Sequence, residues 1–598
     1  MLRRKGACSH RTSAPDAVKE NKPDGVVVGR DSEETPMLDT LIKDALIFDG
    51  SGAPPRRGSI GIRDGRIVDG SETAGGGGAA AREIIDAGDL ALMPGIIDAH
   101  THYDAQLTWD PYADPSISLG VTTVVIGNCG FTIAPCRPEH RDLTMRNLTQ
   151  VEGMALDALR RGITWEFESF RDYMAMLDAR GLVPNVAAFV GHSSIRTFVL
   201  GEEASHRAAT DGELARMQDL VRDAMSAGAI GFASSTNEPH NGEGGIPMPS
   251  RLADQREFIG LASAMAESGR GVFMLTKGSV TSIAALEEVA AESTRPIVVA
   301  AMLHDSVLPD SVFGEVDAMR RARERGHRLY PQVSCCPLTM EFTLVSAYVF
   351  EGLQSWRPAM QATRGGLAAV YAAPSFREAV RKDLSEPVGN RLFNGEWARI
   401  RVVETKRPEN RDLEGLTIEE LARRQGKPPL DAMLDLAIAE DLETLFAAEL
   451  KNSDEEAVGR LLRDPDNHIA LSDAGAHLTF LCDADFGLHL LGHWVRDRQV
   501  MSLEEAVRRL TGQTASLFGI TGRGRIATGC AADLLLFDPA TVGRGRKRRA
   551  HDLPGGASRL VAEPRGVHAV WVNGVKVADA TGTIASGARP GRLLREFI

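Results

Sequence analysis

The sequence predicts a closed barrel of eight β/α units, with a small β-sandwich formed by both chain ends. Two observations predict the barrel. Short β-branched runs alternate with amphipathic helical stretches from residue 94 to about 480, and eight such runs can be counted. A third observation predicts the β-sandwich, because residues 38–93 and 521–598 both consist of short strand-like runs broken by turns. The fold class is therefore α/β, with a TIM-type barrel between two β-rich ends.

Size and charge restrict the class of protein. The chain has 598 residues, which is too long for one ordinary hydrophobic core, so two or more structural parts are expected. Hydrophobic residues make up 43% and charged residues 25%, as in typical globular proteins. The formal net charge of −13 argues against a general nucleic-acid-binding protein, because contacts to phosphates require clustered cations.

Three features of the sequence predict a cytoplasmic location. No apolar run reaches the roughly 18 residues of a membrane-spanning helix. The N-terminal stretch carries basic side chains but lacks the apolar segment of a secretory signal. The seven cysteines are few and unevenly spaced, which favours reduced thiols over a disulfide framework.

The first element in chain order is expected to lie outside the fold. Residues 1–36 are polar, rich in Pro, Gly and charge, and without periodicity. They are interpreted either as a disordered tail or as an incorrectly assigned extension, with translation starting at Met37. In residues 38–93, alternating patterns and Asp-Gly pairs predict antiparallel hairpins, which form the N-terminal part of the β-sandwich. The four glycines at 75–78 predict a loop.

Residues 94–520 make up the predicted barrel. Its strand-like runs lie at 96–102, 122–127, 186–192, 229–235, 271–276, 297–303, 328–334 and 468–473. The interval at about 335–467 is too long for a single crossover, so it is expected to hold a mostly helical insertion. After a helix at 503–519, residues 521–598 return to short strands and are expected to complete the β-sandwich.

Two histidines end the first run of the barrel. In PGIIDAHTHYD, His100 and His102 share a parity, so on a strand both imidazoles point the same way. Two imidazoles on one face at a strand end are typical of half a metal site. The alternative interpretation is one surface histidine and one hydrogen-bonded core histidine.

Other strand ends supply matching ligand types. Active sites of β/α barrels form at the C-terminal ends of the strands. The second run leads to Cys129, and the eighth ends in Asp473. Two histidines, a thiolate and a carboxylate at one barrel mouth form a credible zinc ligand set. The alternatives are a small buried hydrophobic residue for Cys129 and a capping or turn residue for Asp473.

Three more residues near strand ends are weaker candidates for a metal or substrate contact: His192, Lys277 and His304. His192 precedes two serines, and its alternative role is to orient a loop. Lys277 ends the fifth run. His304 ends the sixth, and a surface position is the alternative interpretation.

These motifs together resemble a known family. The segments PGIIDAHTHYD, VTTVVIGNCGF, FVGHSSIR, AGAIGFASS, SDAGAH, GRIATGCAADLLLFDP and VWVNGVKV resemble the amidohydrolase superfamily. The GNCGF segment and the SDAGAH context are similar to its N-acyl-D-amino-acid deacylase (D-aminoacylase) branch. The resemblance runs from Met37 to the C-terminus. It implies a (β/α)8 TIM barrel of the metal-dependent hydrolase type with a β-sandwich built from both ends.

The resemblance also implies a cofactor and roles for particular residues. The expected cofactor is zinc, as one or two ions. The implied ligands are the HxH pair, the cysteine of GNCGF and the aspartate of strand eight, which are His100, His102, Cys129 and Asp473. Asp473 is further implied as the general base, which takes a proton from the metal-bound water and later delivers it to the leaving nitrogen.

One departure from the family pattern concerns the metal count. The family's deacylases place histidines at the ends of strands five and six. Here the fifth run ends in MLTKG, without a histidine, and His304 in AAMLHD fits strand six only with a shifted register. Lys277 is an alternative ligand if carboxylated, as in related cyclic amidohydrolases, although those carry the lysine on another strand. The number of metal ions and the preference for D-amino acids therefore stay open.

The leading hypothesis is a zinc-dependent amidohydrolase that cleaves a linear, non-peptide amide, such as an N-acyl-D-amino acid or a related N-acyl amino acid. The alternatives are a hydrolase of cyclic amides of the hydantoin or dihydropyrimidine type, and a catalytically impaired barrel that acts as a binding protein. The expected partner is a small-molecule amide, with no nucleic acid and no membrane. The oligomeric state is not predicted.

Overall fold

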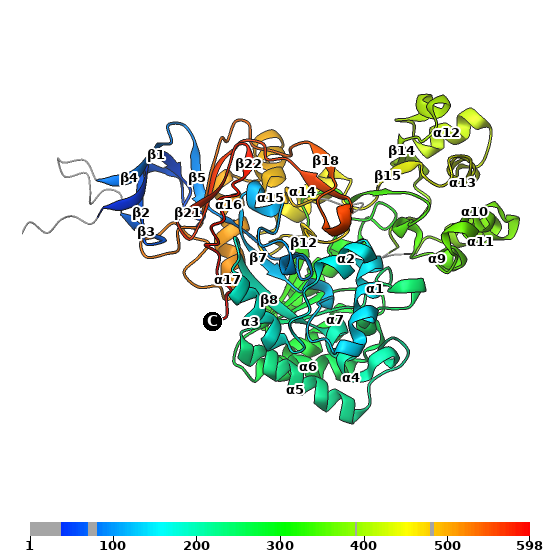
Figure 1. Ribbon diagram of the computed structural model, residues 1–598, viewed down its shortest axis with the longest axis horizontal. Helices are drawn as coiled ribbons and strands as arrows, with labels where there is room; N and C mark the ends of the chain where they lie inside the picture. Colours follow the sequence, from blue (N-terminus) through cyan, green and yellow to red (C-terminus); the bar gives the residue numbers. More distant parts are fainter. Residues whose placement is uncertain (1–36, 70–79, 389–390, 479–482) are drawn as a thin grey trace, which may run out of the picture.

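Four ranges of the chain are described by the structure, a computed structural model: residues 37–69, 80–388, 391–478 and 483–598 (Figure 1). The expected tail at 1–36 and the expected loop at 75–78 lie outside these described residues. No helix within the four ranges combines the length and the apolar character needed to cross a membrane.

Eight parallel strands form one curled sheet, which confirms the predicted barrel class. They are β6 (Ile96–Asp98), β7 (Val121–Ile126), β8 (Asn185–Gly191), β9 (Gly231–Ser235), β10 (Val272–Thr276), β11 (Ile297–Ala300), β12 (Leu329–Val333) and β16 (His468–Ile469). Each strand pairs with the next in this order. An isolated parallel bridge between Thr101 and Ala474 then joins the segments that follow the first and the last strand.

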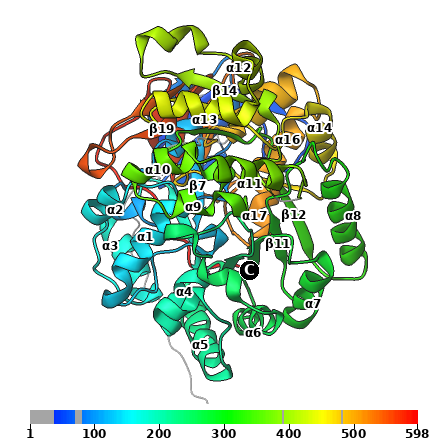
Figure 2. The same cartoon turned by 90° about the vertical axis from the view of Figure 1, so that its right-hand side faces the viewer.

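Helices between the strands cover the outside of the sheet. They include α3 (Phe170–Arg180), α5 (Asp211–Ala227), α6 (Gln255–Ala266), α7 (Ile283–Ser293) and α8 (Ser311–Glu324). Figure 2 shows α3 to α8 following one another around the lower rim. The starts of α3 and α5 are specified by the sequence, because Ser169 and Thr210 form capping boxes there. The buried faces of strands and helices form one large apolar core.

The two ends of the chain meet in a separate nine-stranded sheet, as predicted. The junction is the antiparallel pairing of β5 (Ala91–Pro94) with β17 (Leu534–Phe537). This sheet has its own apolar core, which includes Ile42, Leu92 and Trp571. Its other strands are β1 (Leu38–Ile47), β2 (Arg56–Arg63), β3 (Arg66–Asp69), β4 (Ala81–Asp86), β20 (Val567–Val572), β21 (Val575–Asp579) and β22 (Gly582–Thr583).

A part with its own core lies between β12 and β16. It contains α10 (Arg364–Ala372), α11 (Pro374–Leu384), α12 (Ile418–Gln425) and α13 (Pro429–Ala439), which agrees with the helical content expected there. It also contains a small sheet with the strand order β13 (Thr339–Phe342), β15 (Leu445–Glu449), β14 (Ile400–Glu404). These strands are only four or five residues long, and they were not predicted from the sequence. Figure 1 shows this part at the opposite end of the molecule from β1–β4. The exact division of the chain into domains stays a prediction.

Candidate metal centre

The HxH pair lies immediately beyond β6. This strand ends at Asp98, and Thr101 between the two histidines forms an isolated bridge to Ala474. His100 and His102 therefore point to the same side, and both are buried, with 1% and 5% of their surface exposed. Ser472 secures the segment, because its Oγ lies 2.5 Å from Asp98 Oδ2 and 3.2 Å from His100 O.

Cys129 and Asp473 come from tight turns after two other strands. Cys129 follows β7 in a turn between Gly127 and Gly130, both with positive φ. A Cβ on Gly130 would lie 2.6 Å from Ala233 O, so a side chain there would collide with backbone. Asp473 follows β16, just before the residue that bridges to the HxH segment. Three strand ends thus deliver four side chains to one place.

The four side chains approach one another through their ligand atoms. Asp473 Oδ1 lies 3.2 Å from His100 Nε2 and 3.5 Å from His102 Nε2. Cys129 Sγ lies 3.6 Å from His100 Nε2 and 4.0 Å from His102 Nε2. The ligand atoms of His100, His102 and Cys129 all lie within 4.8 Å of one another, and Asp473, outside this group of three, contacts the two imidazoles.

The distances from the two imidazoles to Asp473 and Cys129 are in the range expected around a zinc ion. Zinc binds imidazole nitrogen and carboxylate oxygen at about 2.0–2.2 Å, and thiolate sulfur at about 2.3 Å. A tetrahedron with such bonds has N···O edges of about 3.3 Å and N···S edges of about 3.6 Å. The observed N···O and N···S separations are close to those edges. The residues present therefore fit the ion.

The outer nitrogen of His100 has a hydrogen-bond partner, and that of His102 lies beside a carboxylate. Gln332 Oε1 lies 2.6 Å from His100 Nδ1, and Glu152 Oε1 lies 3.2 Å from His102 Nδ1. With protons on these Nδ1 atoms, both Nε2 lone pairs are directed at the shared point. Gln332 is itself held, because its Nε2 lies 3.4 Å from His468 Nδ1. Such outer partners orient ligands and raise their basicity.

The electrostatics of the cluster favour anionic ligands. Burial raises the pKa of the Cys129 thiol, but its contacts with His100 and His102 lower that pKa overall. Burial likewise opposes ionisation of Asp473, yet the neighbouring His102 and His100 hold its pKa well below its usual range. A thiolate and a carboxylate together carry two negative charges, which balance a divalent cation.

Backbone strain is concentrated around the same point. Left-handed φ angles are unfavourable for residues other than glycine, cost about 1–3 kcal/mol each, and cluster at functional sites. The residues concerned are Cys129 (56°), Leu471 (76°), Asp473 (50°) and His477 (52°). Each of these side chains contributes to the lining of one small cavity. The surrounding barrel therefore holds the ligands in conformations that the local chain disfavours.

The cavity between these residues has a volume of about 40 Å³. A water molecule needs about 10–15 Å³ of such space, so the cavity has room for an ion with one or two waters. Apart from the four candidate ligands, its lining consists of Phe131, Val151, Glu152, His240, Thr276, Ala301, Leu471 and His477.

His240 lines this cavity, although the sequence analysis did not select it. Its Nδ1 lies 2.6 Å from Ser235 Oγ, and its ring packs edge-on against Phe131. Burial, together with the nearby His477 and Arg251, lowers the pKa of His240 well below its usual range, so the imidazole is neutral at pH 7. The residue lies in a loop beyond the end of β9, where no periodic pattern marks it.

Lys277 and His304 do not line the metal cavity. Lys277 Nζ forms an ion pair of 2.8 Å with Glu315. The His304 ring packs near Phe313, and its backbone N–H donates to Asn452 Oδ1 at 2.9 Å. The structure therefore places both side chains apart from the point where the other candidates converge.

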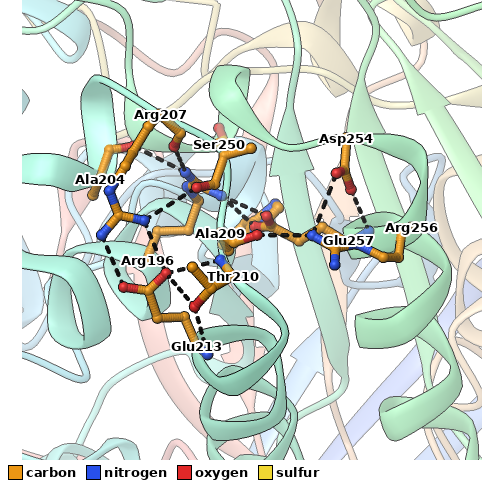
Figure 3. A network of polar contacts seen from close by, with 12 residues as sticks. Arg196, Ala204, Arg207, Ala209, Thr210, Glu213, Ser250, Asp254, Arg256 and Glu257 are labelled. Carbon is orange, nitrogen blue, oxygen red and sulfur yellow. Dashed lines mark hydrogen bonds and ion pairs between the residues drawn. The ribbon is translucent and has the colours of Figure 1, made fainter.

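His192 is also outside the cavity, in a fully buried polar network. Its Nε2 lies 2.7 Å from Glu257 Oε1, and its Nδ1 lies 2.8 Å from Ser234 Oγ. Glu257 also pairs with Arg196 (Figure 3). The Arg196 Nη1 donates to both carboxylate oxygens of Glu257 at 2.6 Å. Burial raises the pKa of Glu257, but His192 and Arg196 bring it down to about 2. The geometry assigns His192 a structural position in the barrel wall.

Comparisons with known proteins find amidohydrolases along most of the chain. A family model described as "Amidohydrolase family" matches residues 83–342 and 391–578. The D-aminoacylase of Alcaligenes xylosoxydans xylosoxydans is 30% identical over 565 residues, which cover 93% of this chain and 97% of that protein.

Comparison with solved structures also finds enzymes of this kind along most of the chain. A crystal structure of D-aminoacylase, described as defining a novel subset of amidohydrolases, matches with a TM-score of 0.63 and 26% identity, covering 94% of this chain and 100% of that one. The N-acyl-D-glutamate deacylase of Bordetella bronchiseptica, complexed with zinc and a phosphonate mimic of the tetrahedral intermediate, matches with a TM-score of 0.62 and 27% identity at the same coverage. The zinc in that relative agrees with the donor set described above.

The contact between Gln332 and His100 predicts an effect on metal affinity. Gln332→Met removes the acceptor at His100 Nδ1 while keeping the side-chain length, so zinc affinity should fall by about 10- to 100-fold. Competition with a chromophoric chelator measures this, and Gln425→Met, an exposed change on α12, is the control. An unchanged affinity in a natively folded Gln332→Met protein would contradict the assigned contact.

The buried Glu257 network predicts an effect on stability. Glu257→Gln breaks the pair with Arg196 and should lower the free energy of unfolding by about 3–5 kcal/mol. The surface pair of Asp211 with Arg256 provides the control, since Asp211→Asn should change it by about 0–1 kcal/mol. Urea denaturation measures both variants.

The same network predicts a pH dependence of stability. Folding lowers the pKa of Glu257 from 4.5 to about 2, so the higher free energy of unfolding of the wild type over Glu257→Gln should be fully present at pH 7 and should disappear as the pH falls from 4.5 to about 2. Equal decreases in the free energy of unfolding of Glu257→Gln and Asp211→Asn would refute the stabilising role of the Glu257 network.

Proposed function

The chain belongs to the amidohydrolase family, and from this premise we propose that it is a zinc-dependent enzyme that hydrolyses a linear, non-peptide amide. The proposed substrate class is an N-acyl-D-amino acid or a related N-acyl amino acid. One observation carries the proposal: two imidazoles, a thiol and a carboxylate converge on one buried point. The similarity to D-aminoacylase over nearly the whole chain supports the choice of bond.

The zinc would be held by His100, His102, Cys129 and Asp473. When bound, such an ion acidifies a water ligand and polarises the carbonyl of the substrate. Asp473 is the ligand best able to move a proton, because 19% of its side chain is exposed while both imidazoles are almost inaccessible. We assign it the transfer of a proton from the attacking water to the leaving nitrogen, a role that typically contributes about 10²–10⁴-fold to the rate.

His240 contributes a second polar group from the protein. A neutral imidazole at the wall of the cavity can make one hydrogen bond to the substrate without adding charge to the site. The contact with Ser235 Oγ fixes the rotation of the ring. We therefore assign His240 the positioning of the substrate carbonyl.

We propose one metal ion rather than two. The neighbouring strand ends of β10 and β11 contribute Thr276 and Ala301 to the cavity, and neither residue is a usual zinc ligand. Thr276 Oγ1 instead lies 3.1 Å from Cys129 Sγ. Lys277 pairs with Glu315, away from the cavity, so we do not favour the cyclic-amide alternative that would require its carboxylation.

A larger pocket beside the metal cavity supports an amino-acid substrate. This outer pocket measures about 290 Å³ and is lined by Pro239 and Asn241, which flank His240 in sequence, and by Arg251 and Arg357. Within the described part of the chain, neither arginine forms a salt bridge. A guanidinium without a carboxylate partner suits the carboxylate of an N-acyl amino acid.

Replacement of the proposed proton carrier tests the mechanism. Asp473→Asn should keep zinc bound through the other three ligands but lower kcat by about 10²–10⁴-fold, because the amide cannot accept the proton. Hydrolysis of N-acetyl-D-amino acids, with zinc content measured on the same samples, checks this. Glu315→Gln, which removes only the partner of Lys277, should leave kcat unchanged. Full turnover by Asp473→Asn would remove the base assignment.

Metal removal tests the cofactor and its number. Chelation should abolish hydrolysis, and titration with zinc should restore it with saturation at one ion per chain, because one set of ligands converges among the residues that the structure describes. Elemental analysis by mass spectrometry gives the stoichiometry. Two ions per chain would contradict the single-ion proposal, and undiminished hydrolysis by the zinc-free protein would contradict the metal-dependent mechanism.

A further inference from the structure

The outer pocket contains two carboxylates that its arginines do not neutralise. Glu351 and Glu238 both line it, together with Arg251 and Arg357. Within the described residues, neither glutamate forms a salt bridge with either arginine. The pocket therefore presents separate positive and negative groups rather than closed ion pairs.

Glu351 is the more deeply buried of the two, with only 7% of its surface exposed. Its Oε1 accepts a hydrogen bond from Gln150 Nε2. Its Oε2 is buried and has no hydrogen-bond partner among the described residues. Burying a carboxylate oxygen without a donor is unfavourable by several kcal/mol, so such a group calls for an explanation.

Glu238 repeats this arrangement on the loop after β9. Its Oε1 accepts from the Ser279 backbone N–H at 2.8 Å and from the Ser279 hydroxyl. Its Oε2 is buried and, within the described part of the chain, lacks a hydrogen-bond partner. Two glutamates from different segments, both lining the same pocket, therefore each have one buried oxygen without a hydrogen-bond partner among the described residues.

Glu351 lies close in sequence to a residue that packs against the lining of the metal cavity. Tyr348, one turn earlier in the chain, packs its ring 5.3 Å from that of His477 in the metal cavity. His240 lies in the cavity wall, and its neighbours Pro239 and Asn241 line the outer pocket. A substrate whose amide lies at the metal cavity can thus extend its amino-acid side chain into the outer pocket.

We propose that the outer pocket selects substrates with a cationic side chain, of the lysine or arginine class, and that Glu351 is the group that receives the cation. This inference rests on the proposed function. Arg251 or Arg357 takes the α-carboxylate, and the free oxygens of Glu351 and Glu238 take the ammonium or guanidinium hydrogens. An acidic side chain, as in the substrate of an N-acyl-D-glutamate deacylase, would place its carboxylate beside those of Glu351 and Glu238.

Burial raises the pKa of Glu351 to about 7, against the hydrogen bond from Gln150 that lowers it. An assay at pH 8 therefore keeps this carboxylate ionised. At that pH the lysine and arginine side chains remain cationic, so the two charges required by the inference are both present.

The test compares N-acetyl-D-lysine, N-acetyl-D-leucine and N-acetyl-D-glutamate on the zinc-loaded protein and on Glu351→Gln. The wild type should show its highest kcat/KM on the lysine derivative. Glu351→Gln should lower that value by about 10- to 100-fold, as expected for loss of a charge-assisted hydrogen bond, and leave the leucine derivative within twofold. Glu404→Gln, an exposed change on β14, is the matched control and should alter neither value.

Several outcomes would overturn the inference. A preference for the leucine or glutamate derivative would do so, and so would an unchanged lysine-to-leucine ratio in Glu351→Gln. If Glu351→Gln does not fold, the partly exposed Glu238→Gln carries the same comparison. Hydrolysis without a lysine preference refutes the inference alone, whereas no hydrolysis of any derivative refutes the proposed function. In that case, calorimetric binding of D-lysine against D-leucine still decides the inference.

Discussion

The junction between the first and last strands of the barrel is the constraint on which the site depends. The His102 backbone N–H donates to Ala474 O at 2.7 Å, and the Ala474 backbone N–H donates to Ser472 Oγ at 3.0 Å. Ser472 in turn contacts Asp98 and the His100 carbonyl. These short contacts link segments that are separated by more than 370 residues in sequence. Without them, the HxH imidazoles and the Asp473 carboxylate would belong to separate edges of an open sheet.

Because the ligands are fixed by backbone contacts, the site can hold conformations that a mobile loop would not keep. Cys129 and Asp473 both have left-handed backbones, Gln332 orients the His100 imidazole from behind, and Glu152 lies beside the outer nitrogen of His102. The strain and the burial of these polar groups are unfavourable for folding, and the packed barrel core compensates for them. Rigid placement of this kind is what a metal site requires, since the ligands meet the ion at distances set within a few tenths of an ångström.

Local patterns in the sequence were sufficient for the barrel and for the residues nearest the strand ends. Period-two parity placed His100 and His102 on one face, and the order of β/α units placed Cys129 and Asp473 at the same mouth. His240, Gln332 and Glu152 could not be found this way. Their roles arise from contacts between segments far apart in the chain, and a loop histidine or a buried glutamine carries no periodic signal. The same limit applies to His192, whose strand-end position gave no sign of its buried partner Glu257.

The proposed metal ligands and the residues proposed to select the substrate lie in different parts of the chain. The metal ligands belong to turns that follow barrel strands, where the framework leaves little freedom for substitution. The outer pocket combines the loop after β9 with residues from the part between β12 and β16, among them Glu351, Arg357 and Arg391. That part has its own core, so its surface residues can change without disturbing the barrel. Differences in substrate among proteins that share this barrel are therefore expected to reside there. The unpartnered carboxylate oxygens of Glu351 and Glu238 in the described residues are a feature that such variation can produce.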